Sequence, residues 1–201
     1  MRICRALGDD ASALQHATAA GRAGEPWRQR LQAAVAGELP DTRRVVRDVP
    51  FVRQDHLTCS PATMACLLRH HGVDKDQQEI AGQITYDGTA SHRELEWATA
   101  NGLCVWFFQF DPEVARRLID LDLPFAISTR YETNGHRQAL VGYDAVLDTF
   151  VLRDPGSNLR PEYNAEWLTK HSEVRGGDCA LILPQELAAR VPQDALQLLS
   201  V

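Results

Sequence analysis

The chain has 201 residues, of which 44% are hydrophobic and 24% are charged, and its formal net charge is −6. The length and composition are ordinary for one globular domain with a sizeable core and a small appendage. The lack of a basic run argues against nucleic acid as a partner, and no stretch approaches the ~18 apolar residues of a membrane helix. Because the N-terminus has no apolar signal core, we expect a cytoplasmic protein with no membrane partner.

Residues 1–48 are expected to form a helical N-terminal extension. Residues 1–49 carry 8 arginines and 6 acidic side chains, whereas residues 50–201 carry 13 basic and 21 acidic side chains. This change in charge favours a boundary near residue 49. Apolar stripes predict two helices, at residues 9–24 and 26–37. These two helices could be a hairpin that docks a protein partner, or the last part of a helical repeat array. The alternative is a solvated N-terminal tail. We expect an ordered helical appendage.

A cysteine at the start of a helix organises the rest of the chain. Pro50–Val52 is expected to be a short strand that leads through a polar loop to Cys59, where the helix begins. Pro61 suits the first turn, because its missing N–H would be unpaired there in any case, and Gly72 ends the helix. A thiol at a helix N-terminus feels the positive end of the helix dipole, which favours the thiolate. Cys59 is therefore a candidate nucleophile, and Gln54 lies close enough to direct its amide to the same point.

The other cysteines and the histidines do not indicate a metal site. The five cysteines show no paired spacing, which argues against a disulfide framework and a zinc site and fits a reducing compartment. Cys66 and Cys104 lie in apolar runs and are expected to be buried hydrophobes, which is also the alternative for Cys59. His70 and His92 lack companions at metal-ligand spacing, so we expect no metal and no cofactor.

Helices and strands alternate in the next segment. Residues 76–83 are expected to form a short helix. Ser91 and Glu94 form the S-x-x-E pattern of a capping box at the start of a further helix, which ends near residue 101. Residues 103–110 are a predicted strand, followed by a helix from Asp111 and a strand at 125–129.

Residues 137–143 and 149–153 are predicted to form a β-hairpin centred near residue 146. Antiparallel pairing about that centre sets residue 154 opposite roughly residue 138, so His136 and Asp154 become diagonal neighbours within roughly 7–8 Å at Cβ. Asp144 and Asp148 lie at the turn, roughly 26 Å away at ~3.3 Å per residue. The geometry therefore selects Asp154 as the partner of His136. The simpler alternatives are a turn histidine, a turn-forming aspartate and, for Gln54, a loop residue.

The remaining elements are a helix at 164–171, a strand at 179–183 and a short helix at 184–190. Helices and strands thus alternate up to the strand at 125–129, and the rest of the chain is mostly strand. Residues 185–201 are expected to be a C-terminal helix or tail.

The polar candidates resemble the active site of a known family. The segments Gln54-x4-Cys59-x-Pro61-Ala62, Gly135-His136 before Val141-Gly142-Tyr143-Asp144, and Arg153-Asp154-Pro155 resemble the bacteriocin-processing, or double-glycine leader, cysteine peptidases of the papain-like superfamily. The resemblance covers about residues 49–184, which we expect to be the peptidase domain. It implies an α+β, papain-like fold, in which a helical half that carries the Cys packs on an antiparallel sheet that carries the His and Asp.

The resemblance also implies a role for each polar candidate. Cys59 is the nucleophile, His136 the base, Asp154 the carboxylate that orients the base, and Gln54 the oxyanion-hole donor. The implied activity is hydrolysis of a peptide or protein substrate. Two alternatives stay open: a catalytically inactive peptide-binding module on the same fold, and an acyl transferase that uses the same nucleophile.

Two residues depart from the family pattern. Ser60 stands where relatives often have Gly, and Arg137 stands where they often have an aromatic or apolar residue. Neither removes a catalytic group, but both would change access to the cleft, so the substrate is not specified. Gly176-Gly177 matches a double-glycine cleavage site in type, but it precedes a predicted core strand and is expected to be a loop.

Overall fold

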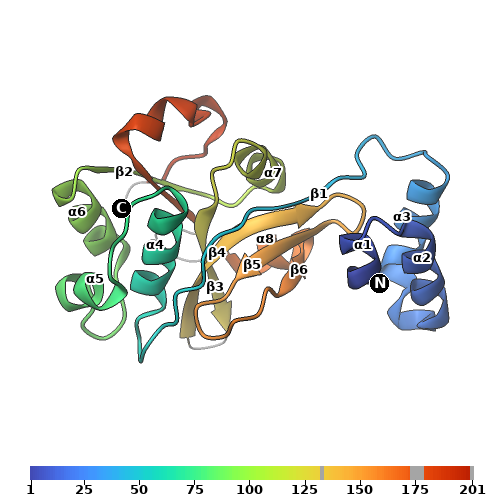
Figure 1. Ribbon diagram of the computed structural model, residues 1–201, viewed down its shortest axis with the longest axis horizontal. Helices are drawn as coiled ribbons and strands as arrows, with labels where there is room; N and C mark the ends of the chain where they lie inside the picture. Colours follow the sequence, from blue (N-terminus) through green and yellow to red (C-terminus); the bar gives the residue numbers. More distant parts are fainter. Residues whose placement is uncertain (132–133, 173–178, 200–201) are drawn as a thin grey trace.

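The computed structural model describes residues 1–131, 134–172 and 179–199 (Figure 1). The loop expected at Gly176-Gly177 lies outside these residues. The described helices are α1 (Arg2–Ala6), α2 (Asp10–Ala19), α3 (Glu25–Val35), α4 (Cys59–His70), α5 (Gln77–Ile84), α6 (Ser91–Ala100), α7 (Pro112–Asp120) and α8 (Ala165–Ser172). The described strands are β1 (Arg44–Val46), β2 (Leu103–Phe108), β3 (Phe125–Tyr131), β4 (Asn134–Asp144), β5 (Thr149–Arg153), β6 (Glu162–Asn164) and β7 (Cys179–Pro184).

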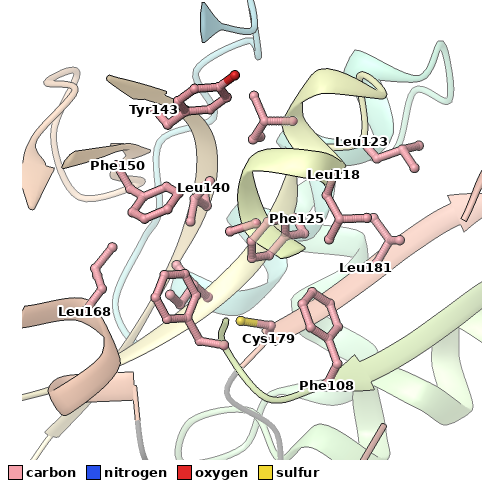
Figure 2. Packing of buried hydrophobic residues seen from close by; sticks show 14 of the residues in the cluster. Phe108, Leu118, Leu123, Phe125, Leu140, Tyr143, Phe150, Leu168, Cys179 and Leu181 are labelled. Atoms are coloured by element: carbon pink, nitrogen blue, oxygen red, sulfur yellow. The ribbon is translucent and has the colours of Figure 1, made fainter. Parts of the chain in front are cut away.

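The described strands form one antiparallel sheet in the order β2-β7-β3-β4-β5-β6. The long strand β4 joins its parts, because its first half pairs with β3 and its second half pairs with both β5 and β1. Successive side chains of a strand point to opposite faces, so the sheet separates two hydrophobic cores. Leu140 of β4 packs on one face with Leu118 of α7 and Leu168 of α8 (Figure 2).

The opposite face of the sheet receives α4. Small side chains line this face, namely Ala126 of β3, Ala139 of β4 and Ala180 of β7, and they leave room for a helix to approach. Every residue of α4 from Ser60 to Leu68 is buried. A helix that is buried all round is held on each side by its neighbours, so the packing of α4 also fixes the place of its first residue, Cys59.

The N-terminal helices pack on the turn of the β4–β5 hairpin, at the far end of the sheet from α4 (Figure 1). Leu31 of α3 is fully buried with Val146 and Leu147 of the turn. Arg5 of α1 is 4% exposed and pairs with the fully buried Asp144 at 3.1 Å. The extension is therefore ordered against the sheet. Its β1 strand was not predicted from the sequence.

Most predicted elements are confirmed, and one predicted strand is wrong. The helix that begins at Cys59, the helices that begin near residues 76, 91 and 111, and the β4–β5 hairpin all form. Pro50–Val52 is not part of the sheet; Pro50 has no N–H to donate to a neighbouring strand, and β1 takes the edge of β4 instead.

The C-terminal segment also differs in detail from its prediction. Residues 185–190 form a 3₁₀ turn rather than an α-helix. A second 3₁₀ turn follows at Gln193–Ala195. The chain after it attaches to the edge strand β2, where the Leu199 N–H donates to the Phe107 carbonyl at 2.9 Å. Among the described residues, no helix is long and apolar enough to cross a membrane.

The predicted capping box at Ser91 and Glu94 is wrong. The N-cap of α6 is Ala90, and no side chain caps the helix there. Glu94 turns inward and is 2% exposed. It lies three and four residues before Trp97 and Ala98, which are buried on the same face of α6, and this helical spacing carries the carboxylate into the interior.

Candidate active site

Cys59 is the first residue of α4 and follows a loop that is anchored on α5. The Asp55 N–H donates to the Thr58 hydroxyl at 2.8 Å. The Asp55 carboxylate in turn accepts hydrogen bonds from the side chains of Gln77 and Gln78, at 2.9 and 3.1 Å. These bonds fix the approach of the chain to the helix, and the free N–H groups of the first helical turn lie around the thiol.

His136 and Asp154 are hydrogen-bonded to each other. His136 Nε2 lies 2.9 Å from Asp154 Oδ1, and both side chains are about one quarter exposed. The carboxylate is held in place by the Gly156 N–H at 2.8 Å and by the Ser157 hydroxyl at 3.2 Å. Because Nε2 faces the carboxylate, Nδ1 is the imidazole nitrogen left for the thiol of Cys59.

The electrostatics of the site favour a charged thiolate–imidazolium pair. Burial by itself raises the pKa of the Cys59 thiol, but hydrogen bonds from the His136 side chain and the Arg137 N–H outweigh it, so this pKa lies below its usual value. Burial by itself lowers the pKa of His136, but hydrogen bonds with Cys59 and Asp154 outweigh it and raise this pKa. The two shifts have opposite signs, so each group stabilises the charge of the other.

Gln54 lies beside the loop that carries Asp154. Its N–H donates to the Pro155 carbonyl at 2.9 Å, and a Cβ placed on Gly156 would lie 3.9 Å from the Gln54 Oε1 atom. This Oε1 atom is buried, and it has no hydrogen-bond partner within the described residues. The structure therefore brings Gln54 to the Asp154 loop, and among the described contacts its amide makes none to Cys59.

A cleft of about 580 Å³ opens beside Cys59. One wall comes from the helical half, with Leu57, Ser60 and the segment 86–91, and the other from the sheet, with Gly135–Arg137. No described residue of the N-terminal extension lines it. Cys59 and His136 both line this cleft, which is open to solvent.

A network of polar side chains lies beside Cys59 and His136 and lines the same cleft. Glu94 accepts hydrogen bonds from the Ser60 hydroxyl and from Arg137 Nη2, the latter at 2.8 Å. Arg137 Nη1 donates to the Ser128 hydroxyl at 2.8 Å. Sequence reasoning missed Glu94, because its spacing from Ser91 also fits a capping box. The signal that identifies it is its position on the apolar face of α6, in register with Trp97.

Residues 46–174 match the Peptidase_C39 like family. The chain belongs to that family. It is therefore a cysteine peptidase, and the resemblance inferred from Gln54, Cys59, His136 and Asp154 is confirmed at the level of the family. A search of curated proteins finds no match.

Two solved structures share the fold. The first is the peptidase domain of Streptococcus ComA, a bifunctional ABC transporter involved in a quorum-sensing pathway; it is 20% identical with a TM-score of 0.57, and the match covers 68% of this chain and 99% of that one. The second is a double glycine motif protease from an AMS/PCAT transporter in complex with the leader peptide; it is 19% identical with a TM-score of 0.54, and the match covers 72% of this chain and 100% of that one. The predicted α+β, papain-like peptidase fold is confirmed.

Proposed function

We propose that this peptidase hydrolyses peptide bonds with Cys59, His136 and Asp154 as its triad and with Gln54 as an oxyanion-hole donor. The observation that carries the proposal is the 2.9 Å hydrogen bond between His136 Nε2 and Asp154 Oδ1, together with the opposite pKa shifts of Cys59 and His136 that the interaction between their side chains causes. A thiol, a base and an orienting carboxylate in this order are what nucleophilic catalysis requires.

In the first half of the reaction the Cys59 thiolate attacks the carbonyl carbon of the scissile bond. The π electrons move to the oxygen, and the Gln54 amide and the Cys59 N–H stabilise the resulting oxyanion, where one donor contributes ~3–4 kcal/mol. The intermediate collapses, the C–N bond breaks, and His136 gives its proton to the leaving amine. An acyl group remains on the Cys59 sulfur.

In the second half a water molecule replaces the leaving amine. His136, now neutral, takes a proton from the water as the oxygen attacks the thioester carbon. Collapse of the second intermediate breaks the C–S bond, releases the carboxylic acid and restores the thiolate beside a protonated His136. Asp154, which is hydrogen-bonded to His136 Nε2, holds the imidazole in one orientation in both halves of the reaction.

The substrate is a peptide or a protein segment that lies extended in the cleft beside Cys59. Support comes from the cleft walls, which are contributed by both halves of the domain, and from the fold relative that was solved with a leader peptide. We propose cleavage after a double glycine as the first specificity to test. This specificity is measured with a panel of peptides that carry Gly-Gly, Ala-Ala or Leu-Leu before the scissile bond. Mass spectrometry identifies which peptides are cleaved.

The test of the function is hydrolysis by the wild type and by Cys59→Ala. The wild type is expected to cleave at least one peptide of the panel, and Cys59→Ala to lose all turnover with an unchanged circular dichroism spectrum. Equal turnover in the variant would contradict the proposal. Adding an amine acceptor distinguishes acyl transfer from hydrolysis. Transfer adds the mass of the acceptor to the acyl product, whereas hydrolysis adds the mass of water.

We also propose the arrangement of the whole chain. Residues 1–48 form an extension folded onto the peptidase domain of residues 49–184, and residues 185–201 form a C-terminal tail that is attached to β2 through Leu199. The cytoplasm is the proposed compartment, because Cys59 is a free thiol and a reducing environment keeps such a nucleophile free. Docking of a protein partner on the N-terminal helices stays a prediction.

A further inference from the structure

The helical half and the sheet meet at the residue that follows His136. The Arg137 carbonyl accepts a hydrogen bond from the Thr63 hydroxyl of α4 at 3.0 Å, and the Arg137 N–H is among the groups that lower the pKa of the Cys59 thiol. The N-terminal part of α4 is therefore attached to the backbone of β4 at Arg137. Since Cys59 and His136 come from different halves, the distance between them depends on how α4 docks at this point.

Glu94 adds a third element to the same junction. Its carboxylate accepts from Ser60, the residue after Cys59, and from the guanidinium of Arg137, the residue after His136. The side chains of Glu94 and Arg137 are 3% and 6% exposed. One carboxylate on α6 thus bridges the two chain positions that directly follow the proposed nucleophile and base.

Stability alone is a poor explanation for this bridge. Removing two charges from water costs about as much as their attraction returns, so apolar residues of similar volume would serve the fold as well. A carboxylate whose two oxygens accept from two different side chains, by contrast, fixes the direction of both donors. An error of about 1 Å in the placement of reacting groups costs about 10²-fold in rate, so a fixed junction has a direct use beside a catalytic pair.

We propose that Glu94 is a positioning residue, which bridges Ser60 and Arg137 and thereby holds the thiol of Cys59 against the imidazole of His136. The proposal rests on the proposed function of that pair. It also accounts for the two departures from the family pattern together, because the hydroxyl at position 60 and the guanidinium at position 137 are the two donors to one carboxylate. Glu94 touches no reacting atom and acts only through its neighbours.

The test is the rate of Cys59 alkylation by iodoacetamide as a function of pH, followed by mass spectrometry in the intact protein. Glu94→Gln keeps the shape of the side chain but removes its charge. We expect the rate at pH 6 to fall about tenfold, since each pH unit of upward displacement of the thiol titration reduces the thiolate fraction about tenfold. Glu96→Gln is the matched control, because Glu96 lies on the same helix, is exposed and is expected to leave the profile unchanged.

A second variant separates positioning from folding. Glu94→Gln leaves the Arg137 guanidinium buried without its carboxylate, which is destabilising, and the double variant Glu94→Gln/Arg137→Met removes that charge. Positioning predicts that the double variant regains the thermal stability of the wild type but keeps the slow alkylation of Glu94→Gln. Recovery of both properties, or a wild-type profile in Glu94→Gln, would overturn the proposal.

The pH profile of Cys59 alkylation in the wild type tests the Cys59–His136 pair separately from the positioning role of Glu94. Fast alkylation at pH 6 in the wild type, together with its loss in His136→Ala, supports the pair, and an unaltered Glu94→Gln would then overturn positioning alone. An ordinary thiol profile in the wild type would overturn the pair and the positioning role together. Ser60→Ala, which keeps the ion pair and removes one donor, is expected to give a profile between those of the wild type and Glu94→Gln.

Discussion

His136 Nε2 lies 2.9 Å from Asp154 Oδ1, and a β-bulge makes this contact possible. Near the turn the register of β4 and β5 pairs Asp144 with Thr149, and this register would set residue 154 opposite residue 139. One extra residue, Val141, shifts it so that Ala139 pairs with Arg153. A slip of one residue exchanges the faces of a strand, so without the bulge Arg137 rather than His136 would share a face with Asp154.

The residue after the bulge must be glycine. A Cβ on Gly142 would lie 2.4 Å from the Val45 carbonyl oxygen of β1, so Gly142→Ala forces β1 away from β4. We expect a loss of ~1–3 kcal/mol in the free energy of unfolding, measured by denaturant titration. Gly82→Ala is the control, because nothing lies within 4 Å of its added Cβ and alanine favours the helix at that position. Equal stability of the two variants would contradict the close approach of β1.

Asp154→Asn is expected to lower kcat by between about 10²- and 10⁴-fold, because the amide no longer holds the imidazole in the orientation and tautomer that accept the thiol proton. Steady-state kinetics on the best peptide of the panel measure the effect. Asp148→Asn is the matched control, since Asp148 pairs with Arg116 at the turn of the same hairpin. A similar loss of kcat in both variants would mean that the hairpin, not the contact with His136, is responsible.

The Gln54→Ala variant separates the stabilisation of the oxyanion from the reactivity of the Cys59 thiol. Loss of one oxyanion donor is expected to lower kcat by about 10²–10³-fold. The pH profile of Cys59 alkylation should stay the same, because among the described contacts the Gln54 amide makes none to the thiol. Hydrolysis and alkylation measured on one preparation test both statements. A change in the alkylation profile would show that Gln54 acts on the thiol instead.

The N-terminal extension is expected to affect stability rather than catalysis. Arg5 pairs with Asp144 at 3.1 Å, whereas Arg44 keeps a second contact with Asp144 at 3.2 Å. Arg5→Met therefore leaves the buried Asp144 carboxylate with one of its two arginine partners. We expect a loss of ~1.5–3 kcal/mol in the free energy of unfolding and an unchanged kcat. Arg28→Met is the control, because Arg28 pairs only with the exposed Glu25 among the described contacts. A fall in kcat for Arg5→Met with unchanged stability would contradict this account.

The candidate site could be predicted from the sequence because its signals are local. A cysteine before Ser-Pro at a helix start and a hairpin that sets residue 154 near residue 138 need no knowledge of distant contacts. The predicted register at Asp154 is correct, although the sequence pattern did not reveal the bulge at Val141 that produces it. A regular hairpin centred at residue 146 happens to give the same pairing.

The rest of the site depends on contacts between distant segments. Glu94 lies on a helix whose sequence fits a capping box equally well, and only its burial against Ser60 and Arg137 decides between the two. Likewise, the pairing of β1 with β4 and of Arg5 with Asp144 joins residues that lie about 100 positions or more apart in the chain. No local pattern specifies such partners, so the junction behind the site could not be predicted.

The most direct test of the central claim is the alkylation rate of Cys59 against pH in the wild type and in His136→Ala. The pKa of Cys59 is lowered and that of His136 is raised, so the reactive ion pair forms as pH rises through the lowered thiol pKa. The imidazolium is lost as pH rises through the raised imidazole pKa. Cys66, whose pKa burial raises to about 12, is the internal control and should not react in the folded protein.

We predict fast labelling of Cys59 near pH 6, well below the ~8.5 of a free thiol, and loss of that advantage in His136→Ala. A wild-type profile that rises only near the free-thiol value, with no change in the variant, would contradict the claim. Cys59 and His136 would then not form a nucleophile–base pair, and the peptide-binding module would be the better description of this domain.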